Sequence, residues 1–224
     1  MSARDTIFNK VRGALKPQAD QAARAALVAE RLTNAPKGVI PARGQLLDGE
    51  RVTLFCTMAE RLSASVERVA NYDAVPAVAA AYLRERNLPA SLRMGSDSRL
   101  AAMPWDQQRA LQIRKGASDG SDEVGLSHAS AAIAETGTLV MVSGTDNPTT
   151  INFLPEHHIV VVDAADIDGD LEAVLTKIRT RYGKGKMPRT LNLISGPSRS
   201  GDVEQKIILG AHGPRALHII VVGG

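Results

Sequence analysis

The stretch LNLISGPSRSGDVEQKIILGAHGPRALHIIVV, residues 191–222, carries the pattern that decides the fold. It begins with a short apolar run and ends with a strongly apolar one, and each run is typical of a buried strand. Gly196 opens a Gly-Pro turn after the first run, because proline cannot continue a central strand. Asp202 with Gln205 fits a capping box, and Gly210 is a typical helix end. The stretch therefore predicts a strand, a short helix and a second strand.

The turn before this predicted helix has the composition of an anion site. The first N–H groups of a helix lack intrahelical partners and lie at the positive end of its dipole. Ser198 and Asp202 can cap the helix, and Arg199 adds a planar cation suited to a carboxylate or phosphate. With Ser195 and Gly196, they would bind a ligand at the carboxyl end of a sheet strand, as in open α/β folds. The alternative is an ordinary capped turn with a solvated arginine.

The rest of the chain alternates between helical and strand patterns. Apolar residues four apart predict an amphipathic helix over residues 3–16, followed by an alanine-rich helix over 18–32 and a linker over 33–48. Further strands are predicted at 65–69, 91–94, 138–142 and 159–162, and further helices at 49–63, 75–86 and 170–182. Such alternation is typical of βαβ units. We therefore predict a three-layer α/β/α fold with a mainly parallel sheet and an N-terminal helical arm.

A second informative stretch is VGLSHASAAIAETGTLVMVSG, residues 124–144. Ser127 can cap a short alanine-rich helix, and an apolar run further on predicts a buried strand. Glu135, Thr136 and Gly137 would form the turn between them. A carboxylate there could act as a nucleophile, a base or an orienting acceptor. The alternative is a structural acceptor that holds the turn together.

The five histidines are too scattered in the sequence to indicate a metal site. His212 lies near the last strand and could approach the Arg199 turn, whereas His218 lies within that strand and is expected in the core. His157 and His158 should point to opposite sides of an extended segment. His128 is placed on the predicted helix before the Glu135 turn.

These pieces combine into one hypothesis, a pocket between the Glu135 turn and the Ser195–Asp202 turn with His212 at its rim. Arg199 and the helix N-terminus would hold a small anion, which Thr136 and Gly137 would also contact, and Glu135 or His212 would handle a proton. The motivating observation is that these residues all fall at predicted ends of strands or helices.

Composition limits the other classes of function. The formal charge of +3 arises in the first 31 residues, and aromatic residues are only 3%, so a nucleic-acid partner is not expected. No apolar run reaches the ~20 residues of a membrane helix, and the start lacks the apolar region of a signal peptide, so we expect a cytoplasmic protein. The single cysteine, Cys56, cannot by itself hold an iron–sulfur cluster, which needs about four ligands.

Three stretches carry a resemblance to a known family: residues 194–222, IAETGTLVM at 133–141, and RDTIFNKVRGAL at 4–15. Together they resemble the lactate utilisation protein C family, also called the LUD-domain family. The resemblance implies a NagB/RpiA/CoA-transferase-like fold, with a helical arm and linker over residues 1–45 and a LUD α/β domain over 46–224. In that fold group a glutamate can attack a thioester, an analogy that concerns Glu135 at the level of the fold alone.

The resemblance also implies a role in oxidising L-lactate to pyruvate together with partner proteins that carry iron–sulfur clusters. This chain itself is expected to bind no cofactor alone. The apolar stripe of its N-terminal helical arm should cover either the main domain or a second subunit, and the second arrangement would give a homo-oligomer. Whether it is an enzyme stays open. The alternatives are a stand-alone enzyme acting on an acyl-thioester, a phosphosugar or a folate, and a scaffold without chemistry.

Overall fold

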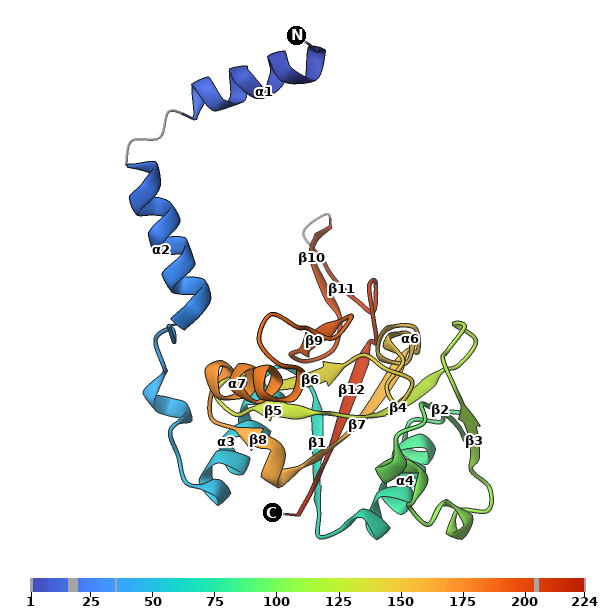
Figure 1. Cartoon of the computed structure of the whole chain (residues 1–224). Helices are drawn as coiled ribbons and strands as arrows, with labels where there is room; N and C mark the ends of the chain where they lie inside the picture. The colour runs from blue at the N-terminus through green and yellow to red at the C-terminus, as the bar shows by residue number, and fades with distance from the viewer. Residues whose placement is uncertain (1, 16–19, 35, 204–205, 224) are drawn as a thin grey trace. The chain divides into compact units, whose positions relative to one another are not determined.

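The computed structural model describes residues 2–15, 20–34, 36–203 and 206–223 (Figure 1). The chain divides into two compact units, Met1–Val39 and Ile40–Gly224, and each is described by itself.

The first unit contains two helices, as predicted, α1 (Ala3–Ala14) and α2 (Gln21–Asn34). A capping box begins α1, in which the Asp5 amide donates to Ser2 Oγ and the Ser2 amide donates to Asp5 Oδ2. Large apolar side chains on both helices are exposed: Ile7, Phe8, Val11, Leu27, Val28 and Leu32.

The second unit is built on a six-stranded sheet in which every strand pair is parallel. Its strands, in spatial order, are β1 (Ser65–Val69), β12 (Ala216–Val222), β7 (His157–Asp163), β4 (Val124–His128), β2 (Ser91–Met94) and β3 (Gln112–Lys115). Both faces of the central strands are covered, since β12 and β7 are almost fully buried. Continuous Val/Ile runs therefore mark these strands, as expected for a parallel sheet.

One face of this sheet packs against α4 (Val75–Glu85) and α5 (Ser98–Ala101) through a core that includes Leu83, Leu100 and Ile159. The other face packs against α3 (Asp48–Arg61) and a second, mixed sheet. That sheet has the order β8 (Ile167–Asp168), β5 (Ala131–Ile133), β6 (Thr138–Val142) and β9 (Leu191–Ile194). Helix α7 (Leu171–Tyr182) packs on its outer side through Val174 and Ile178. The predicted three-layer α/β fold with a mainly parallel sheet is confirmed, and the second sheet is an addition to it.

Short elements complete this unit. They are the helix α6 (Thr149–Phe153) and the 3₁₀ turns η1 (Ala42–Gly44), η2 (Tyr72–Ala74), η3 (Trp105–Gln107) and η4 (Ala164–Asp166). None of the helices in the described ranges is both long and apolar enough to cross a membrane.

The helix predicted after Asp202 is wrong. The segment forms a hairpin of β10 (Arg199–Val203) and β11 (Lys206–Leu209), which pair antiparallel with Arg199 opposite Leu209 (Figure 1). The four-residue spacing of Val203 and Ile207 matched a helix, but so short an apolar run cannot distinguish helix from strand. Its β-branched residues favour a strand, and an isolated helix of this length is marginal.

The helix predicted from Ser127 is also wrong, because this alanine-rich segment forms the end of β4 and then β5. Each residue of both strands is buried. Gly125 in β4 passes so close to α6 that an added Cβ would lie 2.6 Å from the Ile151 carbonyl oxygen. Small residues are needed here for close packing between layers, and that need overrides the helix propensity of alanine.

Candidate functional site

A cavity of about 290 Å³ lies at the amino ends of β7 and β12, beside α6 and the segment that follows β9. Five of the predicted site residues line it: Ser195, Gly196, Ser198, Arg199 and His212. We call this cavity the amino-edge pocket. Asn152 and His158 also line it, and each is only 1% exposed, so they form its buried floor. Neither floor residue is predicted from the sequence to bind a ligand.

The polar groups at the pocket mouth are held by local hydrogen bonds. Arg199 is exposed, and its Nη2 donates to Ser63 Oγ at the end of α3. The His212 amide donates to Ser198 Oγ at 3.3 Å. The Ser198 amide donates to the Pro214 carbonyl at 2.8 Å. Backbone and serine contacts therefore hold the 195–199 and 212–214 segments together around a guanidinium that solvent can reach.

Two features of the predicted anion site need correction. Because β10 replaces the predicted helix, Ser198, Arg199 and Asp202 are not at its N-terminus, and the dipole expected from that helix does not contribute to the site. The strand β9 before the turn pairs antiparallel with β6 in the second sheet, so the pocket is not at the carboxyl edge of the parallel sheet. Asp202 lies in β10, and its side chain and Gln205 are outside the part of the chain that the structure describes.

Glu135 lies in the turn between β5 and β6, and none of the described pocket-lining residues comes from that turn. Its carboxylate is buried, with Oε2 3.9 Å from Arg43 Nε, and its amide donates to the Gly169 carbonyl at 3.2 Å. Next to it, Gly44 packs so closely on Gly169 that an added Cβ would lie 2.2 Å from the Gly169 oxygen. These contacts hold Glu135 beneath η1.

The Glu135 turn and the Ser195 turn are nevertheless neighbours. Thr136 Oγ1 lies 2.7 Å from Thr138 Oγ1, which lies 2.7 Å from Ser195 Oγ. Gly137 has φ of +64° and sits against α3, where a Cβ would lie 2.4 Å from the Ala59 nitrogen. Thr136 thus connects to the pocket through hydroxyl groups, and neither Thr136 nor Gly137 lines it.

The other histidines are held inside the fold. His157 Nδ1 lies 2.9 Å from the Tyr82 hydroxyl, while His158 Nε2 lies 3.0 Å from Ser127 Oγ, so the two rings point to opposite sides as predicted. His218 is buried, with Nδ1 2.8 Å from Ser65 Oγ and its ring stacked on Tyr82. Its predicted place in the core is confirmed. Burial lowers the pKa of His218 to about 4 and that of His158 to about 3.

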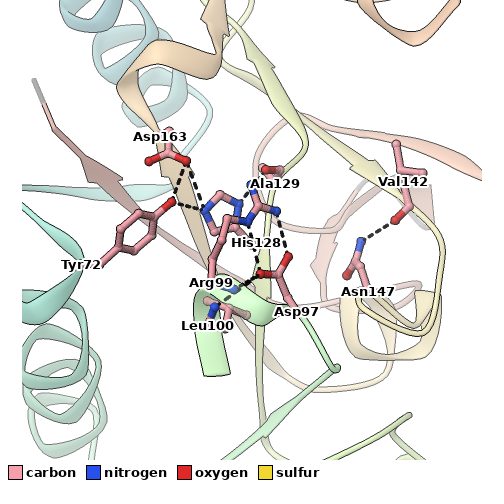
Figure 2. A network of polar contacts seen from close by, with 9 residues as sticks. All are labelled: Tyr72, Asp97, Arg99, Leu100, His128, Ala129, Val142, Asn147 and Asp163. Atoms are coloured by element: carbon pink, nitrogen blue, oxygen red, sulfur yellow. Dashed lines mark hydrogen bonds and ion pairs between the residues drawn. The ribbon is translucent and has the colours of Figure 1, made fainter. Parts of the chain in front are cut away.

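A second polar cluster lies at the opposite, carboxyl edge of the parallel sheet (Figure 2). Tyr72 follows β1, Asp97 and Arg99 follow β2, His128 ends β4 and Asp163 ends β7. We call these residues the carboxyl-edge network. Open α/β sheets usually bind ligands at this edge. Polar residues after three predicted strands were the available signal, whereas His128 was predicted to lie on a helix.

Hydrogen bonds join this network across three strands. The Tyr72 hydroxyl donates to Asp163 Oδ2 at 2.6 Å and lies 2.8 Å from His128 Nε2. His128 Nδ1 lies 2.7 Å from the Ala129 carbonyl oxygen, which can only accept, so Nδ1 carries a proton. Figure 2 shows Arg99 beside His128, with its guanidinium on Asp97 at 2.8 Å.

The network has one proton fewer than it needs for all of its contacts to be hydrogen bonds. The single Tyr72 proton is donated to Asp163, so the contact between Tyr72 and His128 Nε2 is a hydrogen bond only when Nε2 is also protonated. Burial, and then the charge of Arg99, lower the pKa of His128, which leaves the ring neutral at pH 7. Burial and then the bond to Asp163 raise the pKa of Tyr72. The network can therefore accept one proton between groups already in contact.

Metal ligands are not clustered in the described ranges, where no group of three or more His, Cys, Asp or Glu side chains is arranged to hold an ion. Cys56 is half-buried on α3, and burial raises the pKa of its thiol.

The chain is similar to one protein family and to several known proteins. The profile of the LUD domain family matches residues 52–222. The lactate utilization protein C of Halalkalibacterium halodurans is 29% identical over 119 residues, covering 52% of this chain and 51% of that protein. The protein of the same name from Bacillus subtilis (strain 168) is 31% identical over 119 residues, covering 52% and 49%. The chain thus spans about half the length of these curated relatives.

A solved structure shares the fold. It is the crystal structure of a DUF162 family protein from Deinococcus radiodurans, which is 22% identical and superposes with a TM-score of 0.59. The match covers 80% of this chain and 99% of that one. At this identity the likeness concerns the fold alone. The family profile, in contrast, spans the parallel sheet, the second sheet and the pocket segments, and this chain belongs to the LUD domain family.

Proposed function

We propose that this chain takes part in L-lactate utilisation and that its own contribution is to bind a small organic anion in the amino-edge pocket. The role is supported by relatives named lactate utilization protein C, which the chain matches over about half their length. The observation that carries the binding site is a cavity of about 290 Å³ in which a reachable guanidinium and a buried polar floor occur together. That combination suits a ligand with a carboxylate at one end.

Arg199 would bind the carboxylate, since a planar guanidinium matches two carboxylate oxygens. Ser195, Ser198 and the backbone of Gly196 would contact the ligand from the turn that follows β9. His212, at the mouth, is the proposed proton-handling residue. Glu135 is held beneath η1 by Arg43 and Gly169, a position that favours its structural role over its catalytic one.

Oxidation of lactate to pyruvate releases two electrons and two protons, so the pathway needs an electron acceptor. With one cysteine, this chain cannot supply the ligands of an iron–sulfur cluster. We therefore propose that partner proteins carry the clusters and take the electrons, while this chain holds the small anion. The cytoplasmic location predicted from the sequence belongs to this proposal, and cell fractionation tests it.

The test is growth on L-lactate by a strain that lacks this chain. We expect the wild-type chain to restore growth and Arg199→Ala to restore it poorly, because the carboxylate loses its cation. Arg189→Ala, which removes an exposed arginine outside the pocket, is the matched control. Unimpaired growth without the chain contradicts the role in lactate utilisation. Full rescue by Arg199→Ala contradicts the proposed site.

The carboxyl-edge network favours a second candidate function, a stand-alone enzyme that transfers a proton to or from a small molecule. The observation behind it is that the Tyr72 hydroxyl, which donates its one proton to Asp163, also lies against His128 Nε2. Turnover of an acyl-thioester, phosphosugar or folate by the isolated chain, abolished by His128→Gln, would favour this function. A scaffold would instead be favoured if the isolated chain shows no turnover and if a variant loses both copurification with the partners and growth on lactate.

We also propose that the exposed apolar faces of α1 and α2 mediate a homo-oligomer. Ile7 and Val11 lie one turn apart on α1 and are both about half exposed or more. Sedimentation of the full chain should then give an oligomer, and Ile7→Glu with Val11→Glu should give a monomer. A wild-type chain that sediments as a monomer contradicts this expectation.

A further inference from the structure

The floor of the amino-edge pocket contains two buried polar atoms, His158 Nδ1 and Asn152 Nδ2, without a hydrogen-bond partner among the described residues. Both side chains line the cavity, and both residues are 1% exposed. A buried polar atom without a partner is costly, and such atoms are rare in native proteins. Eight such atoms occur among the described residues, and these two belong to residues that Ser127 links by hydrogen bonds and that line one cavity. A ligand bound there can supply the missing partners.

The hydrogen bonds of Ser127 determine which of these two atoms donates and which accepts. Its hydroxyl has one proton, which it donates to Asn152 Oδ1 at 3.0 Å. The contact of 3.0 Å between Ser127 Oγ and His158 Nε2 is then a hydrogen bond only if Nε2 donates. Burial lowers the pKa of His158 to about 3, so the ring is neutral and Nδ1 has no proton. The floor therefore offers one acceptor, His158 Nδ1, and one donor, Asn152 Nδ2.

The same conclusion holds if the oxygen and nitrogen of the Asn152 amide exchange places. Asn152 would then donate to Ser127, and Ser127 would donate to His158 Nε2. His158 Nδ1 would carry the proton, and the Asn152 oxygen would be the free acceptor. In either arrangement the floor presents one donor and one acceptor. A hydroxyl group can satisfy both, whereas a carbonyl oxygen, which only accepts, leaves the acceptor of the floor unpaired.

We propose that the amino-edge pocket takes a short hydroxy acid, with its hydroxyl on His158 and Asn152 and its carboxylate on Arg199, in preference to the corresponding oxo acid. The inference rests on the proposed function in that it uses the same pocket for a small anion. It adds that this chain discriminates between the reduced and the oxidised member of such a pair. Leaving a buried acceptor unpaired should weaken binding of the oxo acid about tenfold or more.

Calorimetric titration of the full chain tests this with two pairs, L-lactate against pyruvate and glycolate against glyoxylate. We expect each hydroxy acid to bind about tenfold more tightly than its oxo acid. Propionate, which has the carboxylate but no oxygen for the floor, should bind more weakly than L-lactate. Equal binding within both pairs overturns the inference and leaves the proposed anion site intact. Absence of binding by all five acids overturns both.

Ser127→Ala separates recognition from folding. Ser127 does not line the cavity, but without it His158 can hold its proton on either nitrogen and Asn152 can turn its amide. We expect the variant to keep binding L-lactate while its preference over pyruvate falls toward equality. Ser130→Ala, a serine change outside this hydrogen-bond chain, is the matched control and should keep the preference. An unchanged preference in a folded Ser127→Ala protein contradicts the inference.

Discussion

Thr138 Oγ1 lies 2.7 Å from Ser195 Oγ, and this contact joins the turn after β5 to the turn that borders the amino-edge pocket. Thr138 is 5% exposed in β6, whereas Ser195 is exposed after β9. Because β6 and β9 pair antiparallel, the hydroxyl contact continues their backbone ladder beyond its last residue pair. The position of Ser195 at the pocket mouth therefore depends on a residue that the pocket does not contain.

Thr138→Val should lower the free energy of unfolding by about 1 kcal/mol, the usual net value of a hydrogen bond. The loss of unfolding free energy should not exceed this value, because Ser195 is exposed and can bind water in place of Thr138. Chemical denaturation measures the change. Thr176→Val, an exposed threonine on α7, is the control and should cost less. A Thr138→Val protein as stable as the wild type would mean that the contact contributes nothing.

Gly137→Ala should destabilise the protein by about 3 kcal/mol or more. Its φ of +64° strains an alanine by roughly 1–3 kcal/mol, and the new Cβ would also meet the backbone of α3. Gly185→Ala is a matched control, since its φ is +73° and nothing lies within 4 Å of its added Cβ. Thermal and chemical unfolding of both variants separate the cost of the positive φ from the cost of the steric clash with α3. Equal losses in the two variants would show that contact with α3 is unimportant.

Stability should fall as the pH drops below about 6.5. The pKa of His218 is lowered to about 4 and that of His158 to about 3, so the unfolded state binds protons that the folded state does not. This stability is complete above pH 6.5 and is lost progressively toward the folded-state pKa. Each histidine contributes a slope of up to about 1.4 kcal/mol per pH unit between pH 6 and 4.5.

Unfolding of His218→Phe measured across this range should show a slope smaller by about 1.4 kcal/mol per pH unit, because phenylalanine cannot titrate. Thr176→Val, at an exposed residue of α7 that does not titrate, serves as the comparison and should keep the wild-type slope. A slope that does not change in His218→Phe would argue that this ring is protonated in the folded protein.

Asp163→Asn should lower the pKa of Tyr72. Burial is the main cause of its raised pKa and would persist, but the hydrogen bond to a carboxylate and the nearby negative charge would both be lost. Alkaline titration of phenolate absorbance measures the change, and Tyr72→Phe identifies the contribution of Tyr72 among the three tyrosines. The same pKa in both proteins would mean that Asp163 does not hold the Tyr72 proton.

The elements predicted correctly are those whose pattern is local and long. The run Leu217–Val222 and the run Ile159–Val162 are almost wholly apolar, and they form the adjacent central strands β12 and β7. The helices over residues 3–14, 75–85 and 171–182 combine apolar periodicity with recognisable ends. The Glu135 and Ser195 turns, between which a pocket was predicted, are joined by the Thr138–Ser195 contact, but none of the described pocket-lining residues comes from the Glu135 turn.

The predictions for short segments were wrong where tertiary contacts outweigh local preference. Residues 199–203 and 206–209 form strands, as do 127–128 and 131–133, because pairing and close packing decide the conformation of a few residues that could form either structure. The sequence by itself determined the α/β class, the apolar central strands and the group of residues around Ser195 and Arg199, since these depend on neighbours in the chain. Only the tertiary structure decided that these residues meet His158 and Asn152 at the amino edge, and that Tyr72, His128 and Asp163 meet at the carboxyl edge. The reason is that a side chain's hydrogen-bond partners come from strands adjacent in space, an order that the sequence does not contain.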